Sequence, residues 1–166
     1  MTDSETAVIH NMRARWIIID GYSLMHRQGR PGNLMTARQQ LVRKLEEVAG
    51  RLAERITVVF DGTGLGGGEG YEASAIEIVF SPSDKTADTV IERMAHEVPD
   101  PAGILVVTSD RLERETAGAA GADTMSSGDF LDWCERTRSE LSRQAGARRG
   151  KNFGSKLGDF FPDRLD

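Results

Sequence analysis

The chain has 166 residues, of which 39% are hydrophobic and 28% charged, values that are ordinary for one folded globular domain. No apolar run approaches the ~18 residues that a transmembrane helix needs, and the N-terminal segment is polar, without a signal-peptide core. The single cysteine, Cys134, excludes an internal disulfide and a cysteine-based zinc site, so we expect a cytoplasmic protein without membrane contact.

The net charge of −5 is divided unevenly along the chain. Residues 1–135 carry 13 Lys and Arg against 22 Asp and Glu, whereas residues 136–166 carry 8 against 4. An acidic body with a basic C-terminal segment is typical of a nucleic-acid-binding protein that concentrates carboxylates around a metal. It is also typical of a solvated helix followed by a disordered terminus, and charge alone does not decide between the two.

The first half of the chain alternates between apolar runs and helical periodicity. Residues 16–19 form an apolar run typical of a strand buried on both faces. Apolar residues at helical spacing then predict a helix over 36–55. Two further apolar runs predict strands over 56–60 and 76–80, and the Gly-rich segment 62–70 between them is expected to be a loop.

The second half continues this alternation. A helix is expected over 84–97, with Ser81 or Ser83 as its N-cap. A strand over 104–107, a short helix and a weak strand over 122–125 follow.

The last predicted helix starts at Ser126 or Ser127, and the composition beyond it shifts to Gly, Arg and Lys. We divide the chain into an N-terminal extension over 1–15, one folded domain over 16–144 and a basic C-terminal tail over 145–166. Strands that alternate with helices predict an α/β fold, in which a mostly parallel five-stranded sheet is covered by helices on both faces.

Aspartates follow the predicted strands. Asp20 and Asp61 come directly after strands, and Asp110 lies within a few residues of another. Because the carboxyl ends of parallel strands meet at one edge of the sheet, we expect these side chains to converge there. Asp88 joins them if the helix over 84–97 begins at the same edge.

A cluster of carboxylates needs a cation. Two carboxylates about 4 Å apart repel by roughly 4 kcal/mol at an effective dielectric near 20. Oxygen ligands favour Mg²⁺ or Mn²⁺ over zinc, and such an ion can activate water and neutralise charge on a phosphodiester. One Asp after a strand is more often a helix cap or turn former, but Asp20, Asp88 and Asp110 together favour a metal site.

Four segments carry a resemblance to a known family. Residues 17–24 (IIIDGYSL), 58–62 (VVFDG), 86–92 (TADTVIE) and 106–111 (VVTSDR) resemble, in order and spacing, the motifs of the YacP-like branch of NYN domains, which are relatives of PIN-domain ribonucleases. The Thr-Ala-Asp and Thr-Ser-Asp motifs are its more specific parts. The resemblance implies a PIN-like three-layer sandwich and a divalent-metal-dependent endoribonuclease.

By motif, the resemblance makes Asp20, Asp88 and Asp110 the catalytic, metal-binding acids, with Asp61 at the rim of the metal site and Mg²⁺ or Mn²⁺ as the cofactor. The substrate-binding residues expected around them are Ser23, Lys85, Ser109 and Arg111. The resemblance also implies action on messenger RNA and association with the ribosome. The alternative is a catalytically silent RNA- or ribosome-binding module of the same fold.

Two other motifs match known functional patterns in part, but each lacks an element that its function requires. Residues 62–67 satisfy the G-x-G-x-x-G spacing, but no helix follows to receive a pyrophosphate, so we expect no nucleotide cofactor. The sequence from Phe60 to Thr63 looks like a dehalogenase-type phosphatase motif, yet Val59 stands where that family needs its nucleophilic Asp.

The basic residues near the C-terminus leave two readings open. They form either an RNA-tracking surface that binds through counterion release or a solvated helix end followed by a tail. These residues are Arg136, Arg138, Arg143, Arg148, Arg149, Lys151 and Lys156.

Overall fold

The computed structural model describes residues 13–29, 32–62 and 75–160, with side chains up to residue 150. The Gly-rich loop beyond Gly62 and most of the N-terminal extension therefore lie outside the described residues.

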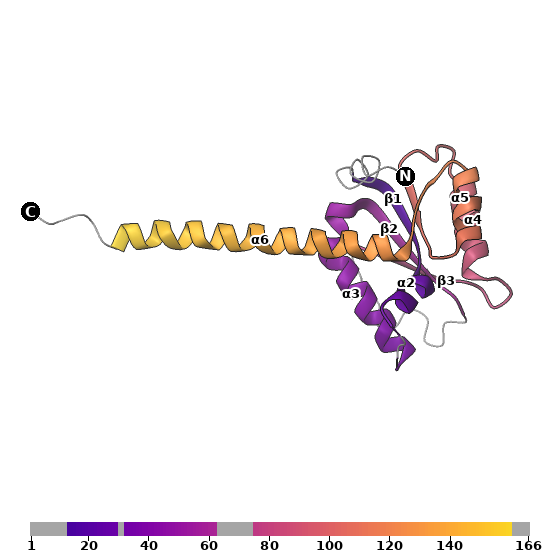
Figure 1. Ribbon diagram of the computed structural model, residues 1–166, viewed down its shortest axis with the longest axis horizontal. Coiled ribbons are helices and arrows are strands. Elements are labelled where there is room, and N and C mark those ends of the chain that lie inside the picture. The colour runs from indigo at the N-terminus through magenta and orange to yellow at the C-terminus, as the bar shows by residue number, and fades with distance from the viewer. Residues whose placement is uncertain (1–12, 30–31, 63–74, 161–166) are drawn as a thin grey trace, which may run out of the picture.

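Five strands form one sheet, in which every strand pairs in parallel with its neighbours (Figure 1). The spatial order is β3-β2-β1-β4-β5, which confirms the predicted five-stranded parallel sheet. The strands are β1 (Ala14–Asp20), β2 (Ala53–Phe60), β3 (Glu77–Phe80), β4 (Ile104–Val107) and β5 (Asp123–Met125).

Helices cover both faces of this sheet, as the three-layer prediction requires. They are α2 (Gly21–Arg27), α3 (Leu34–Leu52), α4 (Ala87–Glu97), α5 (Arg111–Ala119) and α6 (Ser127–Phe160). Alternation along β1 sends Ile17 and Ile19 to the core under α2, α3 and α6, and Ile18 to the core under α4 and α5. The continuous apolar runs in the sequence are thus explained by burial of the sheet on both sides.

The helix expected over 36–55 is wrong at its C-terminal end. It stops at Leu52, and residues 53–55 begin β2, because pairing with β1 competes successfully for this backbone. Trp16 pairs with Arg55 in the register, and the Arg55 guanidinium lies over the Trp16 ring at 4.0 Å. Arg55 also bonds to Glu77 of β3, with 2.8 Å between Nε and Oε1, so its place in the sheet is fixed from both sides.

The helix expected over 84–97 begins later than predicted, at Ala87. Thr86 is its N-cap, since Thr86 Oγ1 accepts a hydrogen bond from the Thr89 backbone N at 3.3 Å. Ser81 and Ser83 are therefore not the caps, and Ser81 Oγ instead donates to Asp61 Oδ1 at 3.0 Å.

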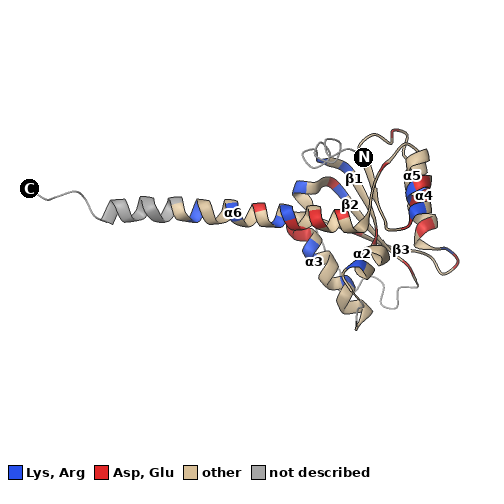
Figure 2. Ribbon diagram, in the orientation of Figure 1, with Lys and Arg blue, Asp and Glu red and all other residues tan. Residues whose placement is uncertain are grey.

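Helix α6 continues as a helix through residue 160 and projects away from the body (Figure 1). Figure 2 shows the positions of basic residues, coloured blue, along the described part of this helix. Gln144 Oε1 still accepts a hydrogen bond from Arg51 Nη2 at 3.2 Å, whereas residues 145–150 are exposed. Among the described helices, none is both long enough and apolar enough to cross a bilayer.

Candidate metal centre

The carboxyl ends of β1 and β4 lie side by side at the centre of the sheet. After β1 the chain enters α2 on one face, and after β4 it enters α5 on the other face. The strand order changes direction here, and in open α/β sheets such a switch point is where ligands bind.

Asp20 ends β1 and caps α2 at the same time. Its Oδ1 accepts hydrogen bonds from the backbone N of Tyr22 and Ser23, at 3.1 and 3.3 Å. Its Oδ2 accepts from the Ser23 hydroxyl at 2.9 Å and from the Thr108 hydroxyl at 3.3 Å. Asp20 as a whole is only 6% exposed, so these bonds hold its carboxylate in one orientation.

Thr108 links the acids of the two strands. Its side chain is fully buried, and its hydroxyl lies 2.7 Å from Glu113 Oε2 as well as 3.3 Å from Asp20 Oδ2. A hydroxyl has one proton, so the shorter contact to Glu113 is the stronger hydrogen bond. Thr108 Oγ1 also accepts from the Asp110 backbone N at 3.1 Å, which fixes the turn between β4 and α5.

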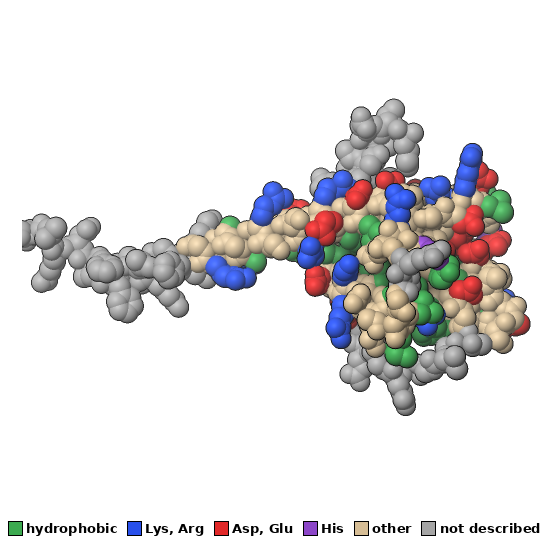
Figure 3. Space-filling view, turned by 60° about the horizontal axis from the view of Figure 1, so that its bottom comes forward, with side chains coloured by type: hydrophobic (Ala, Val, Ile, Leu, Met, Phe, Trp, Pro, Cys, Tyr) green, Lys and Arg blue, Asp and Glu red, His purple; other side chains and the backbone are tan. Residues whose placement is uncertain are grey.

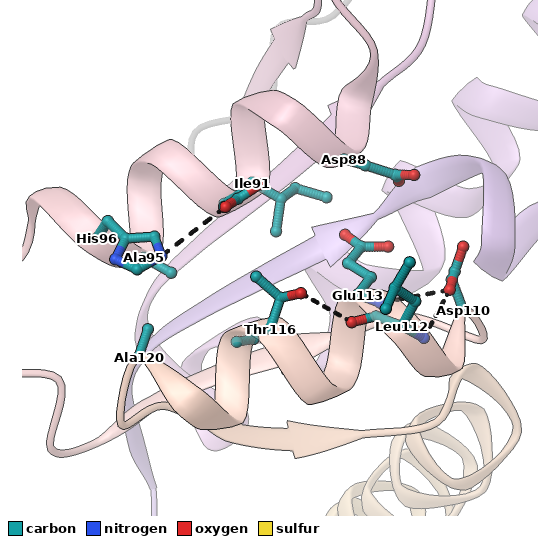
Figure 4. A pocket seen from close by; sticks show the side chains of 11 residues that line it. Asp88, Ile91, Ala95, His96, Asp110, Leu112, Glu113, Thr116 and Ala120 are labelled. Carbon is teal, nitrogen blue, oxygen red and sulfur yellow. Dashed lines mark hydrogen bonds and ion pairs between the residues drawn. The ribbon is translucent and has the colours of Figure 1, made fainter.

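Three carboxyl groups come together around this turn. Asp20, Asp88 and Glu113 each offer an oxygen atom, and these atoms all lie within 4.8 Å of one another. Asp88 is in the first turn of α4 and Glu113 in the first turn of α5. Figure 4 shows the carboxyl groups of Asp88, Glu113 and Asp110 turned toward the same space between the two helices.

The acids disturb one another's ionisation. Burial raises the pKa of Glu113 to about 8; the hydrogen bond from Thr108 opposes this, and the charges of Asp20 and Asp88 add to it. Partial burial of its carboxyl also raises the pKa of Asp88, and the negative charges of Asp20, Asp110 and Asp61 act in the same direction. Within the described part of the chain, the negative charges of these carboxyl groups are therefore not balanced by positive charges around them.

Asp110 and Asp61 lie at the border of this cluster. Asp110 is the N-cap of α5, where its Oδ1 accepts from the backbone N of Leu112 and Glu113 at 2.9 and 3.3 Å. Asp61 follows β2, accepts from the Ser81 hydroxyl, and is close enough to raise the pKa of Asp88. Of the three predicted metal-binding acids, the structure thus brings Asp20 and Asp88 into one group and sets Asp110 beside it.

The predicted substrate-binding residues have different surroundings. Ser23 contacts Asp20 directly, as described above. Ser109 is exposed and lines a separate hollow that also includes Arg27 and Ser126. Arg111 is exposed and pairs with Glu115 at 3.1 Å.

Lys85 is half-buried and stands just before the N-cap of α4. Its backbone N donates to the Pro82 carbonyl at 3.0 Å, so the turn that leads into α4 fixes its main chain. Lys85 is thus next in sequence to the helix that supplies Asp88, at the same edge of the sheet.

Glu113 belongs to the cluster but was not among the predicted residues. The sequence contains a signal for it, since Asp110 and Glu113 are spaced three apart at the start of a helix. That spacing is usually a capping box, in which the glutamate bonds back to the N-cap backbone N–H. Here Thr108 takes that N–H, and the Glu113 side chain is left to point at Asp20 and Asp88.

The donor set fits a hard divalent cation. All three groups are carboxylates, which suit Mg²⁺ or Mn²⁺. Glu113 Oε1 is buried and, among the described residues, accepts no hydrogen bond. No Lys or Arg in the described chain forms an ion pair with Asp20, Asp88 or Glu113. A cation would satisfy both the orphaned oxygen and the excess charge.

Cys134 is remote from this chemistry. It packs against the core under α3 and α6, and burial raises the pKa of its thiol to about 12. A thiol with such a pKa is not a nucleophile at neutral pH.

Comparison with known proteins assigns this arrangement to a family. The model of the YacP-like NYN domain matches residues 17–161, a range that includes the whole of α6. The protein YacP of Bacillus subtilis (strain 168) is 27% identical over 135 residues, which cover 77% of this chain and 79% of that protein.

Solved structures show the same fold. The crystal structure of Rae1 (YacP) from Bacillus subtilis matches with a TM-score of 0.70 and 25% identity, over 87% of each chain. A mutant form of that protein matches with a TM-score of 0.67 and 24% identity, over 82% of this chain and 84% of the other.

Proposed function

Because this chain belongs to the YacP-like NYN domain family, we propose that it is a divalent-metal-dependent endoribonuclease that hydrolyses RNA phosphodiester bonds. The observation that carries the proposal is the meeting of Asp20, Asp88 and Glu113 within 4.8 Å at the switch point of a parallel sheet. The family suggests a nuclease that acts on RNA, and the carboxylates supply the ligand type that phosphodiester hydrolysis with Mg²⁺ or Mn²⁺ needs.

Each residue of the site has a defined task in this proposal. Asp20, Asp88 and Glu113 would hold the cation, with Asp110 and Asp61 at the border. When bound, Mg²⁺ or Mn²⁺ supplies a Lewis acid that neutralises phosphate charge and lowers the pKa of a bound water.

The surrounding residues would orient the acids and the substrate. Thr108 would orient Glu113, to which its hydroxyl donates at 2.7 Å, and the same hydroxyl lies 3.3 Å from Asp20 Oδ2. Hydroxyl and basic groups near the rim would contact the phosphates of the RNA. These are the groups of Ser23, Lys85, Ser109 and Arg111.

The proposal extends to a particular setting. We infer messenger RNA as the substrate, the ribosome as a partner and the cytoplasm as the location. The first two rest on the family resemblance, and the third rests on a composition with one cysteine.

The test is cleavage of single-stranded RNA by the purified protein with Mg²⁺ or Mn²⁺, and with a chelator. We expect cleavage that requires the metal. Asp20→Asn should slow it at least about a hundredfold, which corresponds to about 2.7 kcal/mol of lost transition-state stabilisation. Asparagine keeps an oxygen that can cap α2, so this variant should fold.

Asp123→Asn is the matched control, because Asp123 is exposed on the edge strand β5 and should be dispensable. If the wild-type protein binds RNA but cleaves none with either metal, the endoribonuclease proposal fails and the silent RNA-binding module is supported. Equal cleavage by Asp20→Asn and Asp123→Asn contradicts the assignment of the site.

A further inference from the structure

A groove between α4 and α5 opens beside the carboxylate cluster (Figure 4). Its volume is about 130 Å³. Asp88, Asp110 and Glu113 line one end of it, so the groove and the cluster share their border. Glu92 and His96 line the groove farther along α4. The apolar side chains between them are Ile91, Ala95, Leu112, Ala117 and Ala120.

The size of this groove limits what it can hold. Pockets for drug-sized ligands run from roughly 300 to 1,000 Å³, so a groove of about 130 Å³ takes a smaller, single ring system. Asp88 and His96 are eight residues apart on α4, a rise of about 12 Å. A ligand fragment bound along Ile91 and Ala95 therefore lies next to the acids without displacing them.

We propose that this groove is a nucleobase-binding subsite, which receives the base of a nucleotide adjoining the phosphodiester that is cleaved. The inference rests on the proposed function, because it needs an RNA phosphate at the carboxylate cluster. A phosphate bound there brings its flanking nucleotides to the border formed by Asp88 and Asp110, where the groove begins. Single-stranded RNA can turn such a base out of its stack and into a pocket.

Leu112 gives this groove an unusual wall. It is 71% exposed, although it is a large apolar residue in the first turn of α5. Isolated exposed leucines are common, but this one stands over an apolar floor that includes Ile91, itself 1% exposed. A planar base in the groove would cover the exposed side chain of Leu112, with Ile91 at the floor of the groove, while phosphate contacts outside the groove fix its position.

The polar residues of the groove suit the edge of a base. Glu92 and His96 are about half exposed, with 3.9 Å between Oε1 and Nε2. An ionised carboxylate only accepts hydrogen bonds, so Glu92 would select an edge that carries an amino group. The subsite should therefore favour cytosine, adenine or guanine over uracil.

The kinetic test uses a short single-stranded RNA with one mapped cleavage position. A set of matched substrates is prepared, each of which lacks the base of one nucleotide that flanks the scissile bond. At one flanking position, we expect removal of the base to lower kcat/KM about tenfold. Leu112→Ala should cause a similar loss on the intact RNA and almost none on that abasic RNA, because both changes remove the same contact.

The control variant is Met35→Ala, which alters an exposed apolar side chain of α3 on the opposite face of the sheet. It should cleave intact and abasic RNA at wild-type rates. Glu92→Gln should weaken the preference for amino-bearing bases over uracil without affecting cleavage of the abasic RNA. An equal loss from Leu112→Ala on both substrates, or no effect of any abasic position, overturns the proposal.

A second measurement does not depend on cleavage. Amide resonances of the groove residues would be followed by NMR while cytidine 5′-monophosphate or ribose 5-phosphate is added with Mg²⁺. We expect the nucleotide alone to shift the signals of Ala95, His96 and Leu112. Identical shifts with both ligands overturn the base subsite, whereas a protein that passes this test yet cleaves no RNA would contradict only the proposed function.

Discussion

At the ends of β1 and β4, an aspartate caps the helix that follows with one oxygen of its carboxylate. Asp20 uses Oδ1 for the cap and turns Oδ2 toward Thr108, and Asp110 likewise uses Oδ1 for the cap. Capping and metal binding are therefore compatible roles for one side chain. The cap also benefits the site, because it fixes the rotamer of an acid that must share its surroundings with other acids.

The ionisation of Glu113 predicts how stability depends on pH. Its pKa is raised to about 8 in the folded protein, so the folded state keeps a proton that the unfolded chain has lost above its ordinary pKa of 4.5. Without metal, we expect the free energy of unfolding to fall between about pH 5 and about pH 8, by at most about 1.4 kcal/mol per pH unit for this group. Urea denaturation with a chelator present measures this slope.

Glu113→Gln should flatten the pH dependence, since the amide cannot lose a proton while its oxygen can still accept from Thr108. Asp88, whose pKa is raised as well, would account for a smaller remaining slope. Glu115→Gln, an exposed change on the same helix, should leave the dependence as it is. If the free energy of unfolding depends on pH equally in Glu113→Gln and the wild type, Glu113 is not the source of that dependence.

At the scale of elements, β1 passes into α2 without a loop. Gly21 makes this passage possible, because a Cβ at this position would lie 2.5 Å from Cε1 of Phe60, a fully buried ring. Helix α2 was not predicted from the sequence, in which seven residues of mixed polarity show no clear period. Its existence depends on the cap from Asp20 and on this close approach to β2.

Gly21→Ala should therefore destabilise the protein by about 1–3 kcal/mol, the usual cost of overpacking a core. It should also weaken metal binding, because α2 supplies the backbone N–H groups that hold Asp20. Gly50→Ala is the matched control: nothing lies within 4 Å of its added Cβ, and alanine favours the interior of α3. Chemical denaturation should show a loss for the first variant and a slight gain for the second.

For the whole molecule, the central sheet separates two apolar cores of different character. The core under α2, α3 and α6 contains the large rings of Phe60, Phe130 and Trp133, whereas the core under α4 and α5 is built from smaller residues. Figure 3 shows acidic side chains gathered over the α4 and α5 side of the body, away from the projecting α6. The acid cluster thus opens on the side of the sheet that α4 and α5 cover.

Helix α6 should behave as two parts. Its first part packs in the core, so Trp133→Ala should lower the free energy of unfolding by about 3–5 kcal/mol. Residues 145–150 are exposed beyond Gln144, and their amides should exchange with solvent much faster than those around Trp133.

Gly146→Ala provides the matched variant for this second part, since its added Cβ meets nothing within 4 Å. It should slow hydrogen exchange locally while global unfolding stays within about 0.5 kcal/mol of the wild type. Equal protection along 127–150, measured by hydrogen exchange, would show that α6 opens as one unit and would contradict this division.

The parallel sheet was predictable from the sequence, because strands buried on both faces must be continuously apolar and each must be followed by a crossover. The pattern also placed Asp20, Asp61 and Asp110 at one edge, since carboxyl ends of parallel strands share an edge, whereas Asp88 was expected there only if its helix began at that edge. The ends of the helices could not be predicted from the sequence. Residues 53–55 suit a helix locally, and only pairing with β1 makes them a strand. That Glu113 joins the acids is visible only in the folded chain. Thr108, at the buried end of β4, takes the N–H that this glutamate would otherwise cap, and the carboxyl groups that Glu113 then meets belong to β1 and α4, which are distant in the sequence.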